Sequence, residues 1–433
     1  MEGPDTAAPP AAVRPPHPRS AADAAGAPDP LGTLDVRICR DPDEFAALAP
    51  EWTRLHRSCP RATPFQSHAW LHSWWLSYGR RGRLRVVLVR RGGSGGSEEG
   101  RREGELVGAV ALMRTYRPLP ALVPLGGAIT DYSDVLIAPG TAGAGTEADA
   151  DPGEDRADRA DRADRTGDGA RRGDPVAAAL VRGMRRAARG GVVDLREVPA
   201  GAAAERVYAL WPGPKRRLAD SECLELPGGP MTGLIARVGS SRGQRIRAHL
   251  RKIDASGIEE HDVPAADVPA AIGTILRLHT AQWEGRGVTP EHLRPRFAAH
   301  LGRACARMTE SGEARLTEFR IGGEVVAANL TVLSPTLAGG YLYGADFAAL
   351  HSAKVDLNTL LMRHGARLTT AGDRPVLSMM RGAEPHKAHW RPLSVPNSRL
   401  LLGTRRALPS LLARRALTAA RVRLREVRRR RRR

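Results

Sequence analysis

Residues 314–344 have the sequence ARLTEFRIGGEVVAANLTVLSPTLAGGYLYG and contain two turn signals. Gly322-Gly323 is a strong signal for a two-residue hairpin turn, and Ser334-Pro335 is a second turn signal. The 21 residues from Val325 to Ala345 carry no charge, but their asparagine, proline and paired glycines make them a poor membrane span. The stretch therefore predicts three strands in a meander. The predicted strands are Ala314–Ile321, Glu324–Leu333 and Leu337–Gly344.

Helical patterns surround this meander. They predict a very basic helix at Ser240–Ser256, longer helices near 265–284 and 290–311, a helix at about Val355–Leu368 and a short strand near Val376–Met379. Residues 34–195 repeat the same order of helices, meander, helix and strand. The repeat predicts an internal duplication in architecture, although the two halves share no obvious sequence.

The chain is accordingly predicted to be an α/β protein with two tandem units. A segment rich in proline and alanine precedes the first unit and is predicted to be disordered. Repeated Asp-Arg-Ala triplets interrupt the first unit and contain almost no apolar residues, so they are predicted to form a charged surface insertion. The predicted segments are the disordered N-terminus 1–33, the first unit 34–197 with its insertion 141–174, a connection 198–228, the second unit 229–395 and a basic tail 396–433.

The composition is that of a soluble globular protein, with 42% apolar and 26% charged residues in a chain of 433. The net charge is +20, but residues 401–433 alone contain thirteen arginines against one glutamate. A nucleic-acid-binding fold is therefore not needed to explain the charge.

The cysteines and the N-terminus indicate a reducing, cytoplasmic setting. None of the four cysteines forms a CxxC pair, and the N-terminus has no signal-peptide pattern. No metal-ligand spacing is present, so no metal is expected.

Five short motifs carry a family resemblance. They are LH-x3-W-x3-G at 278–287, GGYLYGAD at 339–346, RGAEPHK-x2-W at 381–390, TPFQS-x2-W at 63–70 and DYSD at 131–134. Their order and spacing resemble the duplicated GNAT acyltransferase family that includes CelD/BcsL-type proteins and is related to Fem-type peptidoglycan aminoacyltransferases. The resemblance implies two GNAT-like domains and transfer of an acyl group from a thioester such as acetyl-CoA. The implied acceptor is an amine or hydroxyl of a small molecule or envelope glycan precursor, attacking directly in a ternary complex.

One feature departs from ordinary acetyl-CoA-dependent members of this superfamily. These members carry a glycine-rich turn whose backbone N–H groups hold the donor pyrophosphate at a helix N-terminus. Here the residues from Ala345 to Lys354 contain no glycine doublet, so Lys354 and the helix N-terminus are the remaining candidates for holding the donor anion. Two alternatives stay open: a Fem-type transferase that uses aminoacyl-tRNA, and a non-catalytic GNAT scaffold that binds an anionic partner.

Three residues of the third predicted strand are candidate catalysts. N-acyl transfer needs a neutral attacking amine, a polarised carbonyl and a proton for the leaving group. Tyr341 and Tyr343 have the spacing of one strand face, and Asp346 lies just past the strand, where GNAT proteins open their donor cleft. The prediction is a tyrosine acid with Asp346 as base or orienter. The alternative is a pair of half-buried strand tyrosines and a helix cap.

Lys387 is one of only four lysines in this arginine-biased chain. A similarly placed lysine in Fem-type relatives contacts substrate phosphate or the reacting carbonyl, and the resemblance implies that role for Lys387. Glu384 and Trp390 in the same motif are candidate substrate contacts, with Glu384 as a general base or an ion-pair partner. The alternative for Lys387 is an ordinary surface lysine.

The DYSD motif supplies the remaining candidates. Asp131, Tyr132 and Asp134 follow a glycine turn, and two carboxylates around a tyrosine could bind an amine or line an interdomain cleft. The alternative is an ordinary turn.

The C-terminal tail combines leucines near helical spacing with arginines and ends in six consecutive arginines. A basic amphipathic helix of this kind suits an anionic membrane surface, and its charge could also bind RNA. The alternative is a solvated, partly disordered tail. These features predict a cytoplasmic protein, peripheral at a membrane if the tail binds lipid.

Overall fold

A computed structural model describes residues 34–92, 104–116, 119–140, 174–284, 289–382 and 384–431, with side chains described as far as residue 420. The disorder predicted for 1–33 and the insertion predicted for 141–174 lie outside these residues, except for Asp174.

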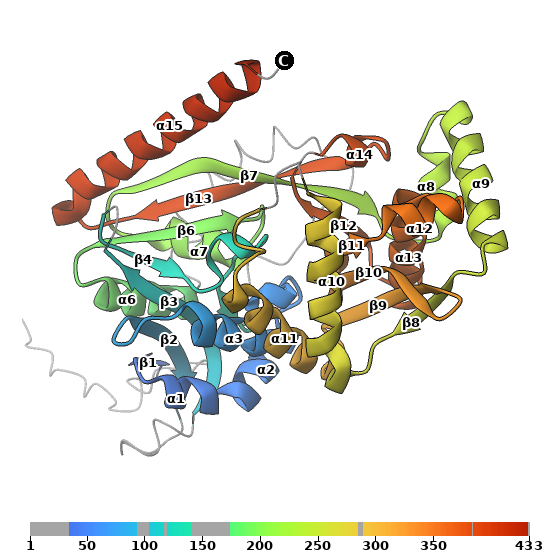
Figure 1. Cartoon of the computed structure of the whole chain (residues 1–433). Helices are drawn as coiled ribbons and strands as arrows, with labels where there is room; N and C mark the ends of the chain where they lie inside the picture. Colours follow the sequence, from blue (N-terminus) through green and yellow to red (C-terminus); the bar gives the residue numbers. More distant parts are fainter. Residues whose placement is uncertain are drawn as a thin grey trace, which may run out of the picture.

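The described residues form one mixed sheet of 13 strands (Figure 1). The strands follow the order β1-β2-β3-β4-β6-β13-β7-β12-β11-β10-β9-β8, and β5 pairs with β3. Their bounds are β1 Leu34–Cys39, β2 Leu84–Arg91, β3 Glu105–Thr115, β4 Ala121–Pro124, β5 Leu136–Ile137, β6 Val192–Val198, β7 Lys215–Pro227, β8 Glu259–Asp262, β9 Ala314–Ile321, β10 Glu324–Leu333, β11 Leu337–Ala345, β12 Val376–Arg381 and β13 Leu393–Leu402.

The two halves of the sheet repeat one pattern. Strands β1 to β4 and strands β8 to β11 are antiparallel runs, and each run is extended by a parallel strand, β6 beside β4 and β12 beside β11. The last strand of each half is exchanged, because β7 pairs with β12 and β13 pairs with β6, while β7 and β13 pair with each other. The exchange makes the sheet continuous across both halves.

The structure differs from the sequence prediction at both exchanged strands. Lys215–Pro227 was expected to be part of a connection, and it is the longest of the described strands. Leu393–Leu402 runs into the segment expected to be a tail. Charged side chains along β7 hide its strand character, since many of its residues face solvent and only a few are buried.

Helices cover both faces of the sheet. One face carries α1 to α3, α10 and α11, whose apolar residues share one core across both halves; α6, α7, α9, α12 and α13 pack with separate clusters. The helix bounds are α1 Pro42–Ala47, α2 Ala49–Ser58, α3 His68–Tyr78, α6 Pro175–Ala188, α7 Ala203–Leu210, α8 Met231–Ala236, α9 Ser240–Ala255, α10 Val268–Gln282, α11 Pro295–Glu310, α12 Phe347–Ser352, α13 Leu357–Ala371, α14 Pro385–Ala388 and α15 Leu408–Arg431.

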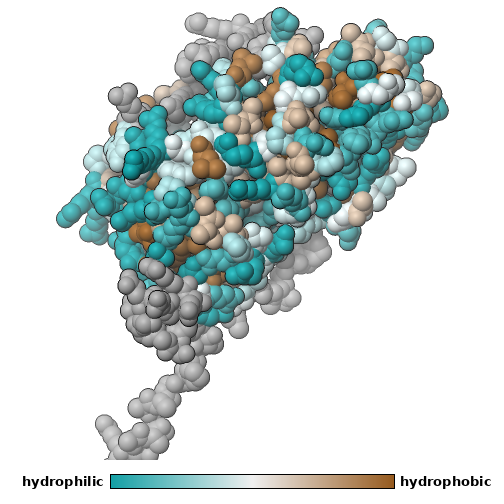
Figure 2. Space-filling view, turned by 60° about the horizontal axis from the view of Figure 1, so that its bottom comes forward, coloured by the Kyte–Doolittle hydropathy of each residue, from teal (hydrophilic) through white to brown (hydrophobic). Residues whose placement is uncertain are grey.

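Helices α3 and α11 join the halves on the shared face. The Ser73 hydroxyl donates to the His300 carbonyl oxygen at 2.9 Å, and the rings of His300 and Trp70 lie 4.5 Å apart. Figure 2 shows that the outer surface on one side is mostly hydrophilic, with small separate apolar patches. No helix among the described residues is long and apolar enough to cross a bilayer.

Gly344 in β11 lets helix α10 approach the strand closely. A Cβ atom at Gly344 would lie 2.4 Å from the Ile275 carbonyl oxygen and 2.7 Å from the His279 nitrogen, both backbone atoms of α10. Gly344→Ala is therefore expected to lower the free energy of unfolding by about 1–3 kcal/mol, measured by urea denaturation. Gly340→Ala on the same strand is the matched control, since a Cβ there meets nothing within 4 Å. Equal effects of both substitutions would contradict the packing argument.

Candidate functional site

Strands β11 and β12 separate after a short parallel contact. They pair only from Leu337 to Gly339 of β11, and the pairing of β12 with β7 shifts register between Ser378 and Arg381. Within that shift Met380 has φ 58°, a left-handed conformation that is uncommon for a residue with a side chain. The carboxyl end of β11 is therefore left without β12 as a neighbour.

The carboxyl ends of β6 and β12 meet near the middle of the sheet. Val198 of β6 pairs with Ser398, while Arg381 of β12 pairs with Cys223. Cys223 in turn pairs with Val395, only three positions from Ser398. Glu197 at the end of β6 also has a positive φ, 54°. Strained backbone at both strand ends is a feature that recurs at functional sites.

Arg381 is the centre of a charged group at this meeting point. Its guanidinium lies 2.8 Å from Glu197 Oε1 and 3.1 Å from Asp131 Oδ1. Both carboxylates are buried, and one guanidinium is shared between them. We call Asp131, Glu197, Tyr341, Arg381 and Lys387 the central cluster.

Lys387 and Tyr341 border this charged group. The Lys387 ammonium donates to the carbonyl oxygens of Arg381 and Gly382, each at 3.2 Å, and pairs with Glu384 at 2.8 Å. The Tyr341 hydroxyl donates to the Ile129 carbonyl oxygen at 2.8 Å. The nearby Asp131 charge raises the pKa of this hydroxyl, and the Arg381 charge lowers it. The central cluster thus combines residues of both halves.

Burial controls the protonation of two members. Burial raises the pKa of Asp131, although Arg381 opposes this shift, and the nearby Glu197 charge adds to it. Burial also raises the pKa of Tyr341 well above its usual value, so its hydroxyl stays protonated at neutral pH. The site therefore holds a carboxylate that gains a proton more readily than usual beside a neutral hydroxyl donor.

Asn397 of β13 makes hydrogen bonds to two residues of the central cluster, Asp131 and Glu197. Its side-chain amide donates to the Asp131 carbonyl oxygen at 3.0 Å and to Glu197 Oε2 at 3.3 Å, and it also reaches Ser221. Sequence reasoning missed Glu197, Arg381 and Asn397 as site residues. Arg381 stands in the quoted RGAEPHK motif, while nothing local marks the other two.

Of the predicted site residues, Tyr341, Asp131, Lys387 and Glu384 come together. The structure places three others elsewhere. Asp346 is exposed, and its carboxylate accepts from the Ala349 N–H at the start of α12, so the helix-cap alternative describes it. Lys354 is exposed with φ 58° after α12. Trp390 is only 2% exposed and packs in an apolar cluster.

Asp134 is also a structural residue. Its carboxylate accepts from the Ala203 and Ala204 N–H groups at 2.9 and 2.7 Å at the start of α7. Burial raises the pKa of Asp134 to about 6, although these hydrogen bonds favour the charged form and lower it. Because both oxygens serve backbone donors, Asp134 caps this helix.

The prediction that Tyr341 and Tyr343 point to one face is wrong. The pairing of β11 with β10 has a bulge between Leu330 and Thr331 that leaves Tyr341 as an extra residue. Tyr341 packs against the core shared by the two halves, whereas Tyr343 packs against the cluster beneath α12 and α13. A bulge breaks the two-residue alternation on which the prediction relied. Burial raises the pKa of Tyr343 as well.

Tyr132 belongs to a pocket beside the cluster. Its buried hydroxyl donates to Glu225 Oε1 and lies 2.9 Å from both this oxygen and the Ser378 hydroxyl. The pocket has a volume of about 270 Å³ and is lined from both halves, with Arg61 and Glu225 as its charged side chains besides Asp134. Its lining includes Pro199 and Ala200, just beyond the carboxyl end of β6, and Leu337 and Val376 at the starts of β11 and β12.

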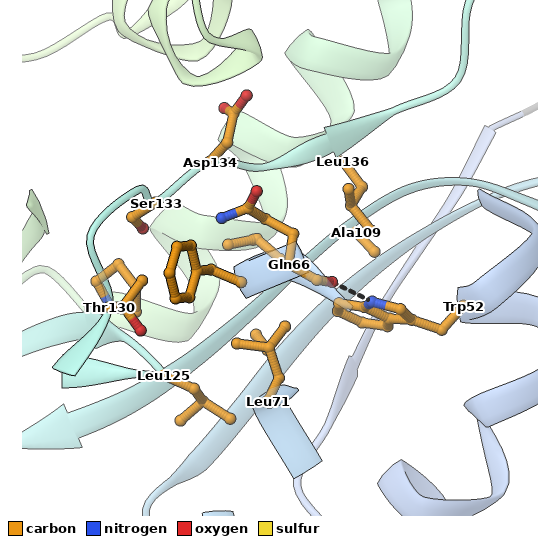
Figure 3. A pocket seen from close by; sticks show the side chains of 13 residues that line it. Trp52, Gln66, Leu71, Ala109, Leu125, Thr130, Ser133, Asp134 and Leu136 are labelled. Carbon is orange, nitrogen blue, oxygen red and sulfur yellow. Dashed lines mark hydrogen bonds between the residues drawn. The ribbon is translucent and has the colours of Figure 1, made fainter. Parts of the chain in front are cut away.

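A smaller void of about 10 Å³ lies nearby, around Gln66, Thr130 and Leu136 (Figure 3). The Trp52 indole N–H donates to the Gln66 carbonyl oxygen at 2.9 Å along one wall. A void of this size holds at most one water molecule, so it is part of the packed core.

The helix N-termini after β11 do not fit a pyrophosphate. Asp346 and Asp356 cap α12 and α13 with their own carboxylates, each accepting a backbone N–H. These negative charges occupy the donors that an anion would need. In contrast, α9 exposes Arg245, Arg247 and Arg251, and its Arg242 contacts the His389 carbonyl oxygen beside α14.

Among the described residues, no group of His, Cys, Asp or Glu side chains is arranged to hold a metal ion.

Comparison with known proteins identifies a GNAT domain in the second half. Residues 240–388 match the family described as acetyltransferase (GNAT) domain. A conserved protein of unknown function from Bacteroides thetaiotaomicron has 10% identity and a TM-score of 0.51, over 86% of this chain and all of that one. FemX has 10% identity and a TM-score of 0.51, over 81% of this chain and 95% of its own. At this identity the likeness shows the fold. No curated protein matches the sequence.

Proposed function

We propose that this chain is an acyltransferase of the duplicated, CelD/BcsL-like GNAT type, acting at the central cluster. It moves an acyl group from a thioester donor such as acetyl-CoA to an amine or hydroxyl on a small molecule or envelope glycan precursor. The GNAT domain at 240–388 supports acyl transfer in general. The observation that carries the assignment is that Tyr341, Asp131 and Lys387 lie close together beside the opening between β11 and β12.

Direct attack gives each of these residues one task. The attacking amine loses its proton to Asp131, whose raised pKa suits it to accept one. The Lys387 ammonium stabilises the oxyanion formed from the thioester carbonyl. Tyr341 donates its hydroxyl proton to the departing sulfur and regains a proton from Asp131. Every proton is then returned, and no covalent bond to the enzyme forms.

The donor phosphates are held by α9 in this proposal. Its exposed arginines supply positive charge next to α14, whereas the caps of α12 and α13 are negative. Arginine binds phosphate oxygens through paired N–H groups, which suits this role. Lys354, the earlier candidate for the donor, lies on the surface just before α13.

A Fem-type donor, aminoacyl-tRNA, is the second candidate. The observation that favours it is the same pair of carboxylate caps at Asp346 and Asp356, which places negative charge at the two helix N-termini that follow β11. The proposal prefers the thioester, since the match of residues 240–388 is to an acetyltransferase domain.

Release of free thiol from acetyl-CoA in the presence of a panel of amines and amino sugars tests the proposal. We expect turnover with at least one acceptor, and loss of turnover in an Asp131→Asn variant, assayed at a temperature at which the variant is shown to be folded; Glu197 still pairs with Arg381 in this variant. Calorimetry with acetyl-CoA and with aminoacyl-tRNA separates the donors. Binding of tRNA alone selects the Fem-type candidate, and binding of neither donor identifies a non-catalytic scaffold.

A further inference from the structure

Helix α15 is fixed to the sheet along one side. Ala407, just before it, and Leu411 are buried against Val192 and Leu401. One turn further, the buried Arg414 guanidinium lies 2.7 Å from Asp194 Oδ2 on β6. These positions recur at helical spacing, so a single face of α15 docks.

Asp194 makes this attachment rigid. Its carboxylate is 2% exposed and accepts from Arg399 of β13 at 2.7 and 2.6 Å as well as from Arg414. Arg399 also donates to the Thr418 hydroxyl one turn after Arg414. Paired, charge-assisted hydrogen bonds of this kind fix orientation as well as contact.

The outward side of α15 is apolar. Leu408, Leu412 and Leu417 are 38%, 45% and 40% exposed. Between Leu408 and Ala420, Arg415 is the only charged residue among those that face solvent. The exposed apolar residues in this range are Leu408, Pro409, Leu412, Ala413, Ala416, Leu417, Ala419 and Ala420. Figure 1 shows α15 extending from the end of β13, on the side of the molecule away from α3 and α11.

The sequence beyond this apolar side is strongly basic. Residues 421–433 contain nine arginines and one glutamate. The helix therefore offers an apolar side over its first three turns and positive charge at its end. We call α15, residues 408–431, the basic helix.

We infer that the basic helix docks on the surface of an anionic phospholipid bilayer. Lipid headgroups match its charge, and the acyl chains below them take up its exposed leucines. A second copy of the chain is disfavoured as occupant because two such segments would repel each other. RNA would match the charge but would leave the leucines exposed to water. The docked face holds the sheet at a fixed orientation to the membrane through Asp194.

Vesicle sedimentation with the full-length chain tests this inference independently of any enzymatic activity. At about 0.1 M salt, where charges are screened beyond about 10 Å, the chain is expected to sediment with phosphatidylglycerol vesicles and not with phosphatidylcholine vesicles. Leu412→Gln/Leu417→Gln is expected to weaken this binding at least about tenfold, because each leucine inserted adds apolar burial. Its melting temperature should stay at the wild-type value, since both side chains are exposed.

The matched control is Leu76→Gln/Leu293→Gln. These leucines are 53% and 55% exposed and belong to α3 and the segment before α11. The control is expected to bind vesicles as the wild type does. Equal binding to both kinds of vesicle, or no effect of the α15 leucines, would overturn the inference. Tighter binding of a single-stranded RNA than of phosphatidylglycerol vesicles would overturn it in favour of RNA.

Discussion

Lys387→Ala is expected to lower kcat by about 10²-fold, which corresponds to about 2.7 kcal/mol of transition-state stabilisation. In the structure the Lys387 ammonium lies at the end of β12, within reach of two carbonyl oxygens and of Glu384. Its substitution removes the only proposed cation for the developing oxyanion. A steady-state assay with saturating donor measures the change, and Lys387→Arg should retain part of the activity.

Lys215→Ala is the matched control for the packing role of a lysine. Lys215 also donates to two carbonyl oxygens, those of Tyr208 and Ala209, at 2.7 and 2.8 Å. It lies at the start of β7, away from the central cluster. We expect Lys215→Ala to lower the melting temperature without changing kcat. If Lys387→Ala behaves in the same way, Lys387 is a structural residue and the catalytic assignment fails.

Arg381→Met is expected to lower the free energy of unfolding by about 3–5 kcal/mol and to abolish activity. The substitution leaves Asp131 and Glu197, both buried, without their shared guanidinium, and removing one partner of a buried ion pair costs this much. Urea denaturation measures the loss. Arg381→Met/Asp131→Asn should recover part of the stability, since it removes one of the two unpaired charges.

An exposed ion pair provides the comparison. Arg296 pairs with Glu291 at 2.8 Å, with its side chain 51% exposed. Arg296→Met is expected to change the free energy of unfolding by at most about 1 kcal/mol. Similar losses for Arg296→Met and Arg381→Met would mean that the central cluster is solvated and that its burial does not shape the site.

Local sequence patterns were sufficient for the regular elements. The strands Ala314–Ile321 and Glu324–Leu333 have the predicted bounds, because their turns are marked by Gly322-Gly323 and Ser334-Pro335. The arginine-rich helix α9 begins at Ser240, where the sequence predicts it. The alternative that Asp346 caps a helix also holds, because an aspartate just before a helix is a local sequence signal.

Features that depend on distant parts of the chain could not be predicted. Glu197 and Arg381 are 184 residues apart, and they meet only because β7 and β13 are exchanged between the halves. The bulge that separates Tyr341 from Tyr343 arises from pairing with β10 and leaves no mark in β11 itself. The charged residues of β7 hid its strand pattern from sequence reasoning, because pairing with β12 and β13 holds this strand in the sheet.

A crystal structure with a bound, non-hydrolysable thioester analogue tests whether acyl transfer takes place at the central cluster. We expect the carbonyl oxygen of the acyl group to lie within hydrogen-bond distance of Lys387 Nζ, with the acyl chain between β11 and β12. Binding of the analogue in the pocket lined by Arg61 and Glu225, with Lys387 still held by the carbonyl oxygens of β12, would contradict it.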